Sequence, residues 1–340
     1  MNMAKRKYTK MKKIEPAVQS FMFTTPTVPS GGSDSFYIDL SQCASLMNRR
    51  FYRQGINWAV SRIKVLTAVF EGAVQVGKLP NTWVMSNAWE KGFRAWQRMN
   101  NEALAESPSV KPKFLDFKIY ADAQHHTDGF GANLRPFDLV GTQAVLGEWE
   151  SSKLVVPFGP ASPGNTAEFE FVAVGGSYPG AGSSGLNAVS LIEGYAASRG
   201  LPNVVDPNTP GDADDADGST PENWLSAMFN DGTDQDSEVI SNLITEQDRA
   251  PYPYEGDSVH VDTQYPGGAN NLDALEIHDY EFVTSTTIGG TTRLKGGNFP
   301  CGLMKFVLSN SSQTTSNVVI QVDLVPGAHR GYLCEPMTEM

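Results

Sequence analysis

The sequence lacks the features that mark several common classes of protein. Its three cysteines, Cys43, Cys301 and Cys334, are odd in number and far apart, so they suggest neither a disulfide framework nor a zinc-site spacing. We expect them to be small buried side chains in a reducing compartment. No apolar run approaches the roughly 18 residues of a membrane-spanning helix, and the N-terminus lacks the apolar stretch of a secretory signal.

Motifs for catalysis are also missing. The chain has no phosphate loop, dinucleotide fingerprint, nucleophile elbow or zinc-protease helix. The most ligand-like cluster contains His125, His126 and Asp128. Because neighbouring side chains on a strand point to opposite faces, we expect a plain loop here, with metal binding as the alternative if a turn brings the histidines together. The sequence therefore predicts no catalytic residue, no metal site and no enzyme.

One acidic segment looks like a calcium loop at first sight, with Asp212, Asp214, Asp215 and Asp217 before Gly218. Its register fails, because placing Gly218 sixth puts Ala213 first and Trp224 twelfth, where a bidentate Glu belongs. We expect a solvated acidic loop and no cofactor. A weak divalent-cation site shared with a neighbouring chain is the alternative.

Positive charge is concentrated at the N-terminus. The first thirteen residues hold six positive charges and no negative one, at Lys5, Arg6, Lys7, Lys10, Lys12 and Lys13. Subtracting these six charges from the net −12 of the chain leaves −18 for residues 14–340. A basic arm on an acidic body favours a polyanionic partner, and nucleic acid is the first candidate. A solvated terminus without a partner is the alternative, and the arm would also serve as a nuclear-localisation patch.

A second basic segment interleaves three arginines, Arg49, Arg50 and Arg53, with Phe51 and Tyr52. Alternating arginine and aromatic side chains can stack on and clamp single-stranded nucleic acid. Arginines can equally pair with the carboxylates of a neighbouring subunit. The sequence leaves both interpretations open.

Frequent turn residues favour a β-rich body of many short strands. Glycine (32) and proline (21) interrupt the chain often, as is typical of strands joined by turns. About eight strand-like runs follow from local alternation. They are 36–40, 58–76 as one long strand or a pair, 114–120, 154–158, 167–174, 277–287, and a hairpin of 302–308 and 318–325 joined by 309–317. Segment 186–198 is a short helix or a strand with a turn.

One helix is predicted after residue 87. Asn87 and Glu90 have the spacing of a capping box, and Trp89, Phe93 and Trp96 form one apolar stripe. We expect this stripe to pack in the core rather than to bind a ligand. The helix lies inside a Greek-key β-sandwich, which fits strands at both ends and long excursions between them better than an up-and-down barrel.

The chain divides into a tail and a body. Residues 1–34 are predicted to form a basic N-terminal arm and a Pro/Gly linker, and residues 35–340 a single β-domain. A long acidic loop insertion is expected at about 200–265, since no Lys or Arg occurs between Arg199 and Arg249. We expect this insertion to face away from any bound nucleic acid.

Three segments together resemble a known family. They are YIDLSQCASLMNRRFYRQG (37–55), LPNTWVMSNAWEKGFRAWQRM (79–99) with FKIYAD (117–122), and FPCGLMKFVL followed by VVIQVDLVPGAHRGYLCEPM (299–337). They are similar, in order and spacing, to the capsid proteins of small circular, replication-initiator-encoding single-stranded DNA viruses, especially the unclassified marine ones. The resemblance lies in the pattern and includes no chemical signature.

The resemblance implies an all-β, single jelly-roll shell domain, an eight-stranded Greek-key β-sandwich. It also implies self-assembly into an icosahedral shell of 60 or more copies, a circular single-stranded DNA genome held by the basic arm, and a location in the virion after assembly in the host cell or its nucleus. The receptor on the host surface is not identified. Sixty arms bring only about 360 positive charges, so Arg49, Arg50 and Arg53, cations or extra subunits must help to neutralise a genome of a few thousand phosphates.

Two other classes of protein are considered. A secreted or surface β-sandwich that binds carbohydrate or mediates adhesion would explain the strands, but it predicts a signal peptide and usually calcium. An enzyme on a jelly-roll scaffold, such as a metal-dependent cupin, needs clustered histidines and carboxylates on strands. The five histidines are scattered, so the sequence favours the capsid protein.

Overall fold

The computed structural model describes residues 16–103, 116–138, 140–157, 166–176, 179–198, 274–284 and 290–339. The basic arm (1–13), the acidic insertion (about 200–265) and the calcium-like segment 212–218 lie outside these residues. The described part is mainly β, as expected. None of its helices is long and apolar enough to cross a membrane.

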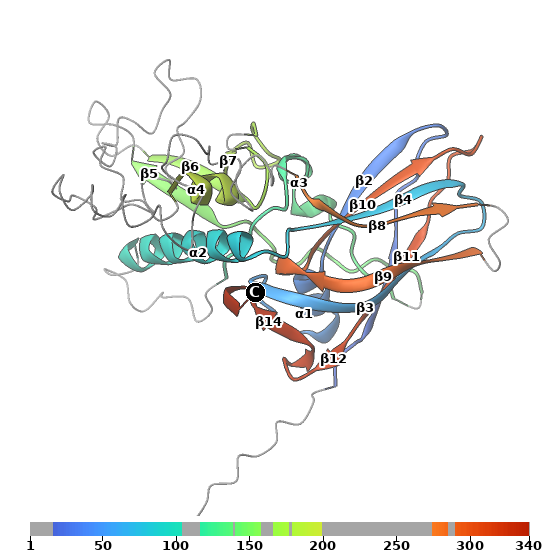
Figure 1. Ribbon diagram of the computed structural model, residues 1–340, viewed down its shortest axis with the longest axis horizontal. Coiled ribbons are helices and arrows are strands. Elements are labelled where there is room, and N and C mark those ends of the chain that lie inside the picture. The colour runs from blue at the N-terminus through green and yellow to red at the C-terminus, as the bar shows by residue number, and fades with distance from the viewer. Residues whose placement is uncertain are drawn as a thin grey trace, which may run out of the picture.

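Two antiparallel sheets form the body (Figure 1). In the first sheet, β11 lies between β1 and β3. Strands β9 and β14 pair with opposite edges of β3, because Trp58 on β3 is the partner of both Phe299 on β9 and Cys334 on β14. The second sheet has the order β2-β10-β4-β8. The strands are β1 (Ser20–Thr24), β2 (Ser33–Asp39), β3 (Ile56–Leu66), β4 (Gly72–Lys78), β8 (Glu276–Val283), β9 (Thr291–Phe299), β10 (Leu303–Asn310), β11 (Val319–Leu324) and β14 (Cys334–Pro336). A small ribbon pairs β12 (Pro326–Gly327) with β13 (Gly331–Tyr332).

The main core lies between these two sheets. Every second residue of a strand points to the same face, and the inward set is apolar in both sheets. Phe306 on β10, for example, pairs with Phe36 on β2 and Val76 on β4, so the register aligns three core side chains across the sheet. Its deeply buried members include Phe21, Phe23, Ile38, Trp58, Ile63, Val65, Val74, Val76, Leu308, Ile320 and Val322.

Strands β4 and β8 pair with each other although residues 79–275 separate them in sequence. The described parts of this excursion contain α2 (Trp83–Ala103), α3 (Ala123–Asp128), the 3-10 turn η2 (Phe130–Ala132) and α4 (Leu191–Ser198). They also contain a third sheet of β5 (Lys153–Pro157), β6 (Thr166–Val172) and β7 (Asn187–Ser190). Figure 1 shows α2 beside this third sheet, and a second apolar core fills the space between them.

The helices differ in part from the sequence-based expectation of a single helix. An additional helix, α1 (Leu40–Asn48), follows β2 because the Asp39 carboxylate caps it, accepting hydrogen bonds from the backbone N–H groups of Ser41 (2.9 Å) and Gln42 (3.2 Å). Helix α2 begins at Trp83, before the expected cap at Asn87. The expectation that its aromatic stripe packs in a core is confirmed for Trp89, which is buried in the second core, whereas Phe93 and Trp96 are only partly buried against that core.

Some strands were also misplaced by local pattern. The predicted pair within 58–76 is confirmed as β3 and β4, and segment 186–198 holds both a strand and a helix. The predicted hairpin of 302–308 and 318–325 is wrong, because β10 lies in the second sheet and β11 in the first. Strand β1 lies within the expected linker and pairs with β11, so residues 20–24 belong to the β-body. Strand β9 was not predicted.

A candidate nucleic-acid interface

The chain that leads to the basic arm is fastened to one end of the body. Val18 donates its backbone N–H to Asn48 Oδ1 at the end of α1 (2.9 Å) and accepts from the hydroxyl of Tyr332 (2.6 Å). Gln19 donates its side-chain N–H to the carbonyl oxygen of Gly331 (3.0 Å). The described residues that precede β1 therefore lie beside the C-terminus of α1, where Arg49 and Arg50 follow directly.

The three predicted arginines lie on the surface at this end. Arg49, Arg50 and Arg53 are all exposed. Arg49 forms the C-cap of α1 with φ 52° and ψ 38°, the left-handed conformation that usually belongs to glycine. Because positive φ disfavours a side chain, the sequence places arginine here at a cost in stability.

The aromatic residues of this segment do not act as one clamp. Tyr52 is 1% exposed and donates its hydroxyl to the carbonyl oxygen of Arg330 (3.0 Å). Gln54 is fully buried and donates to Asp39 Oδ2 (3.1 Å), while it accepts from the backbone N–H of Ile119 (2.7 Å). Alternation thus sends Tyr52 and Gln54 inward, while Phe51 and Arg53 line the surface cavity described next.

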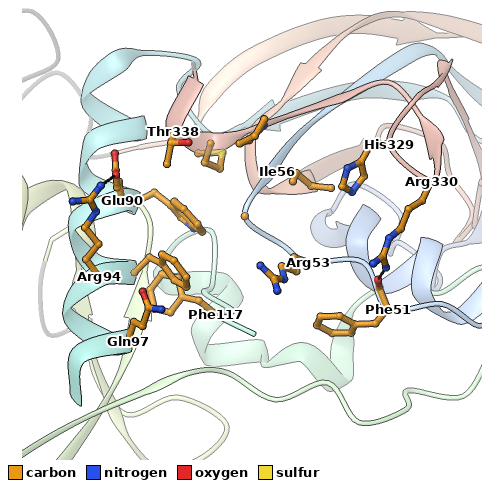
Figure 2. A pocket seen from close by; sticks show the side chains of 15 residues that line it. Phe51, Arg53, Ile56, Glu90, Arg94, Gln97, Phe117, His329, Arg330 and Thr338 are labelled. Atoms are coloured by element: carbon orange, nitrogen blue, oxygen red, sulfur yellow. Dashed lines mark hydrogen bonds and ion pairs between the residues drawn. The ribbon is translucent and has the colours of Figure 1, made fainter. Parts of the chain in front are cut away.

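A cavity of about 630 Å³, here called the Arg53 pocket, opens beside this segment. Figure 2 shows α2 on one side of the pocket. Residues 51–56 and residues 329 and 330 lie on the other side, and the side chain of Arg53 lies between Phe117 and Arg330 in this view. Its aromatic lining is Phe51, Trp89, Phe93 and Phe117, and its basic lining is Arg53, Arg94, His329 and Arg330. These residues come from four separate stretches of sequence.

The aromatic wall of the pocket is part of the second core. The rings of Trp89 and Phe93 stack with centroids 5.1 Å apart and planes 13° apart, and Phe117 lies 5.8 Å from Phe93. Trp89 is 6% exposed, whereas Phe93 is half-buried and also stacks on Trp96, with centroids 6.3 Å apart. Gly55 makes room for Trp89, because a Cβ at residue 55 would lie 2.1 Å from its ring.

Positive charge dominates the lining. Three arginines face a single acid, Glu90, which pairs with Arg94 one turn along α2. The Arg330 guanidinium donates to the carbonyl oxygen of Phe51, which holds it at the rim. Burial lowers the pKa of His329, and the charge of Arg330 lowers it further, so this ring is neutral near pH 7. The lining residues therefore carry a net charge of +2.

One further acid lies close to the pocket. Burial raises the pKa of Asp116, while the charges of Lys118 and Arg53 oppose that rise. Asp116 forms an ion pair with Lys118, whose ammonium also lies 4.4 Å from the ring centroid of Trp149. Arg53 is thus near a carboxylate that already has a partner, and it keeps an exposed side chain for another ligand.

The two adjacent histidines are structural. They lie in α3, not in the expected loop, and both are fully buried. His125 Nδ1 accepts from the backbone N–H of Ala121 (3.0 Å), so Nε2 donates to Asn133 Oδ1 (2.8 Å). His126 bonds to Glu170 (2.8 Å). Within the described ranges, no group of three or more His, Cys, Asp or Glu side chains could hold a metal ion.

The cysteines are free thiols. Cys43 and Cys301 are fully buried, as expected, and Cys334 is partly buried. Burial raises the pKa of all three thiols, to about 12 for Cys334, so each stays protonated.

Sequence reasoning found Arg53 and missed its partners in the pocket. Arg94 stood beside the aromatic stripe of α2, and Arg330 lay in the third family-like segment, but no local spacing connects residues 53, 94 and 330. The fold brings them together. No family model matches the chain, and no curated protein or solved structure matches it significantly.

Proposed function

We propose that this chain is a viral capsid protein with a single jelly-roll shell domain. The observation that carries the proposal is the strand pairing. When β1–β4 and β8–β11 are numbered one to eight along the chain, the first sheet reads 1-8-3-6 and the second 2-7-4-5. This order supports the proposal, because it is the one expected when a Greek key is rolled up into a jelly roll, an architecture of viral shells that also occurs in lectins and cupins.

An exposed edge supports assembly with further copies of the chain. Strand β8 is the edge of the second sheet and exposes three large apolar side chains, Ile277 (63%), Tyr280 (47%) and Phe282 (69%). The rings of Tyr280 and Phe282 are in contact, with centroids 5.2 Å apart. Clustered apolar side chains on a surface mark interaction sites. We propose a closed homo-oligomeric shell of 60 or more copies in which a neighbouring subunit covers β8.

The proposed genome side is the end of the body where the arm leaves. Val18 and Gln19 are fixed beside Asn48 and Gly331, which directly precede Arg49 and follow Arg330 in the chain. In this proposal the basic arm and these exposed arginines meet the genome together, since phosphates attract both without sequence preference. The proposed partners are further copies of the chain and single-stranded DNA, and the proposed location is the virion.

Electron microscopy of the expressed full chain tests the proposal, with light scattering across salt, pH and added single-stranded DNA. We expect closed particles of uniform size. A protein that stays monomeric under all of these conditions would contradict a shell function. Because this test measures particle formation and not binding to a pocket, it stands apart from the site proposed next.

A further inference from the structure

We propose that the Arg53 pocket binds one unpaired base of single-stranded DNA, together with its flanking phosphates. The identity of the ligand as DNA rests on the proposed function. The pocket itself rests on geometry, since an aromatic wall and three arginines face one cavity of about 630 Å³. That volume lies within the range of small-molecule sites and accommodates a nucleotide.

The two kinds of lining match the two halves of a nucleotide. The half-buried ring of Phe93, which stacks on Trp89 and packs against Trp96 and Phe117, borders the cavity beside Phe51, so the cavity has an aromatic wall on which a base can pack. Stacking on aromatic rings tolerates every base, because every base has a π-face. Arg53 and Arg94 are exposed beside this wall and can reach phosphate oxygens, for which the planar guanidinium is well suited.

The charge and the aromatic wall favour DNA over the other occupant considered, a carboxylate of a neighbouring subunit. Such a carboxylate would satisfy the arginines but would leave the aromatic side of the cavity without a partner. The path of the chain points the same way. Gly331, which accepts a hydrogen bond from Gln19, directly follows Arg330 at the pocket rim. The described chain that precedes β1 therefore lies close to the pocket.

This geometry predicts a preference for unpaired strands. In a duplex each base is stacked and paired, so its face cannot reach Phe93 unless the base is flipped out. The arm, which only neutralises phosphates, has no such requirement. The pocket would thus add selectivity for single strands to an arm that lacks it.

Photo-crosslinking of the full chain tests the proposal directly. The probe is a ten-nucleotide oligothymidylate with one 5-iododeoxyuridine, and mass spectrometry of the peptides locates the adduct. We expect adducts at Phe51, Trp89, Phe93 or Phe117, and none of these with the same strand in a duplex. Adducts confined to residues 1–13 or to other surfaces would overturn the proposal.

Paired substitutions give an independent readout. The double variant R53Q/R94Q removes two exposed pocket arginines, and we expect the Kd for the unmodified oligothymidylate to rise about tenfold, with duplex binding changed much less. The control R293Q removes an exposed arginine on β9. Its cross-strand neighbour on β3 is Lys64, which lies eight residues, or about 26 Å, along the strand from Ile56 in the pocket lining. We expect that control to change the Kd less than twofold.

The outcomes separate this site from the shell function. Particles that form while the pocket gives no adduct, or equal Kd values for the double variant and R293Q, would overturn the pocket and leave the shell proposal standing. A protein that stays monomeric but gives adducts in the pocket would overturn the shell proposal and leave the pocket standing.

Discussion

Gly55 lies against the indole ring of Trp89, and a Cβ at residue 55 would come within 2.1 Å of its Cζ2 atom. The ring cannot easily move away, because Trp89 is 6% exposed and stacked on Phe93. The glycine therefore allows the start of β3 to pack directly on α2, and it shapes the floor of the Arg53 pocket.

The substitution Gly55→Ala should lower the free energy of unfolding by about 1–3 kcal/mol, since forcing a methyl group into a packed site strains its neighbours. Urea unfolding measures the change. Gly131→Ala is the matched control, because a Cβ at residue 131 meets nothing within 4 Å. Equal stability of the two variants would show that α2 can shift to make room.

His125 should make the fold sensitive to acid. Burial lowers its pKa to about 4, below the ordinary value of about 6.5, so between these values the unfolded chain binds more protons than the native one. The stabilisation is complete above pH 6.5 and is lost as the pH falls toward 4, by up to about 3 kcal/mol.

The variant His125→Asn keeps an acceptor near the backbone N–H of Ala121 but does not titrate. We therefore expect the stability difference between the wild type and this variant, measured by urea unfolding, to grow as the pH rises from 4 to 6.5. Two parallel stability curves over this range would contradict the assignment of the neutral, buried ring.

Several strands and the core stripe could be predicted from the sequence because their signal is local. Alternation indicated β6 and β8, and the spacing of Trp89, Phe93 and Trp96 indicated a buried helix face. Strand β9 has no such signal, since Gly296 and Gly297 interrupt it. A Cβ at Gly296 would lie 2.4 Å from carbonyl oxygens of β3, so close strand packing, invisible in the local pattern, requires the glycine there.

Only one segment of the candidate site, residues 49–53, could be predicted from the sequence. Its three arginines lie close together in the chain, and their alternation with aromatic residues is visible there. The role of Arg94 and Arg330 depends on α2 and the β12–β13 ribbon meeting residues 51–56. That meeting is a tertiary contact which no local propensity encodes. Likewise, the pairing of β4 with β8 across residues 79–275 depends on closing a long loop.

Arg49 offers a test that separates function from stability. Arg49→Gly relieves a left-handed conformation, which costs an L-residue about 1–2 kcal/mol, although the flexible unfolded chain offsets part of the gain. We expect the free energy of unfolding to stay unchanged or to rise by about 1 kcal/mol. The slope of log K against log salt for single-stranded DNA should become shallower by about 0.7.

Arg49→Gln is the control for this test. It removes the same charge but keeps the strained backbone, so it should reproduce the shallower salt slope without the gain in stability. If both variants bind single-stranded DNA with the slope of the wild type, Arg49 makes no phosphate contact.

The exposed edge of the second sheet should matter for assembly alone. Phe282→Ser removes a side chain that is 69% exposed in the subunit, so unfolding of the subunit should change by less than about 0.5 kcal/mol. If a neighbouring copy covers β8, the concentration needed for particle formation, followed by light scattering, should rise several-fold. Val145→Ser, at a site 81% exposed, is the matched control for a lost apolar side chain. An unchanged assembly threshold for Phe282→Ser would exclude β8 from the contact.

Deletion of residues 2–13 tests the basic arm itself. Six phosphate contacts at about 0.7 each account for a salt slope of about 4 in single-strand binding, and Arg49, Arg50, Arg53 and Arg94 add about 3. The deleted chain should therefore keep only the smaller slope. Because the β-body begins at β1 and holds residues 18–24 by its own hydrogen bonds, particles should still form, but the ratio of their absorbance at 260 and 280 nm should fall to that of empty shells. Particles that retain their full nucleic-acid content without the arm would assign genome binding to the body alone.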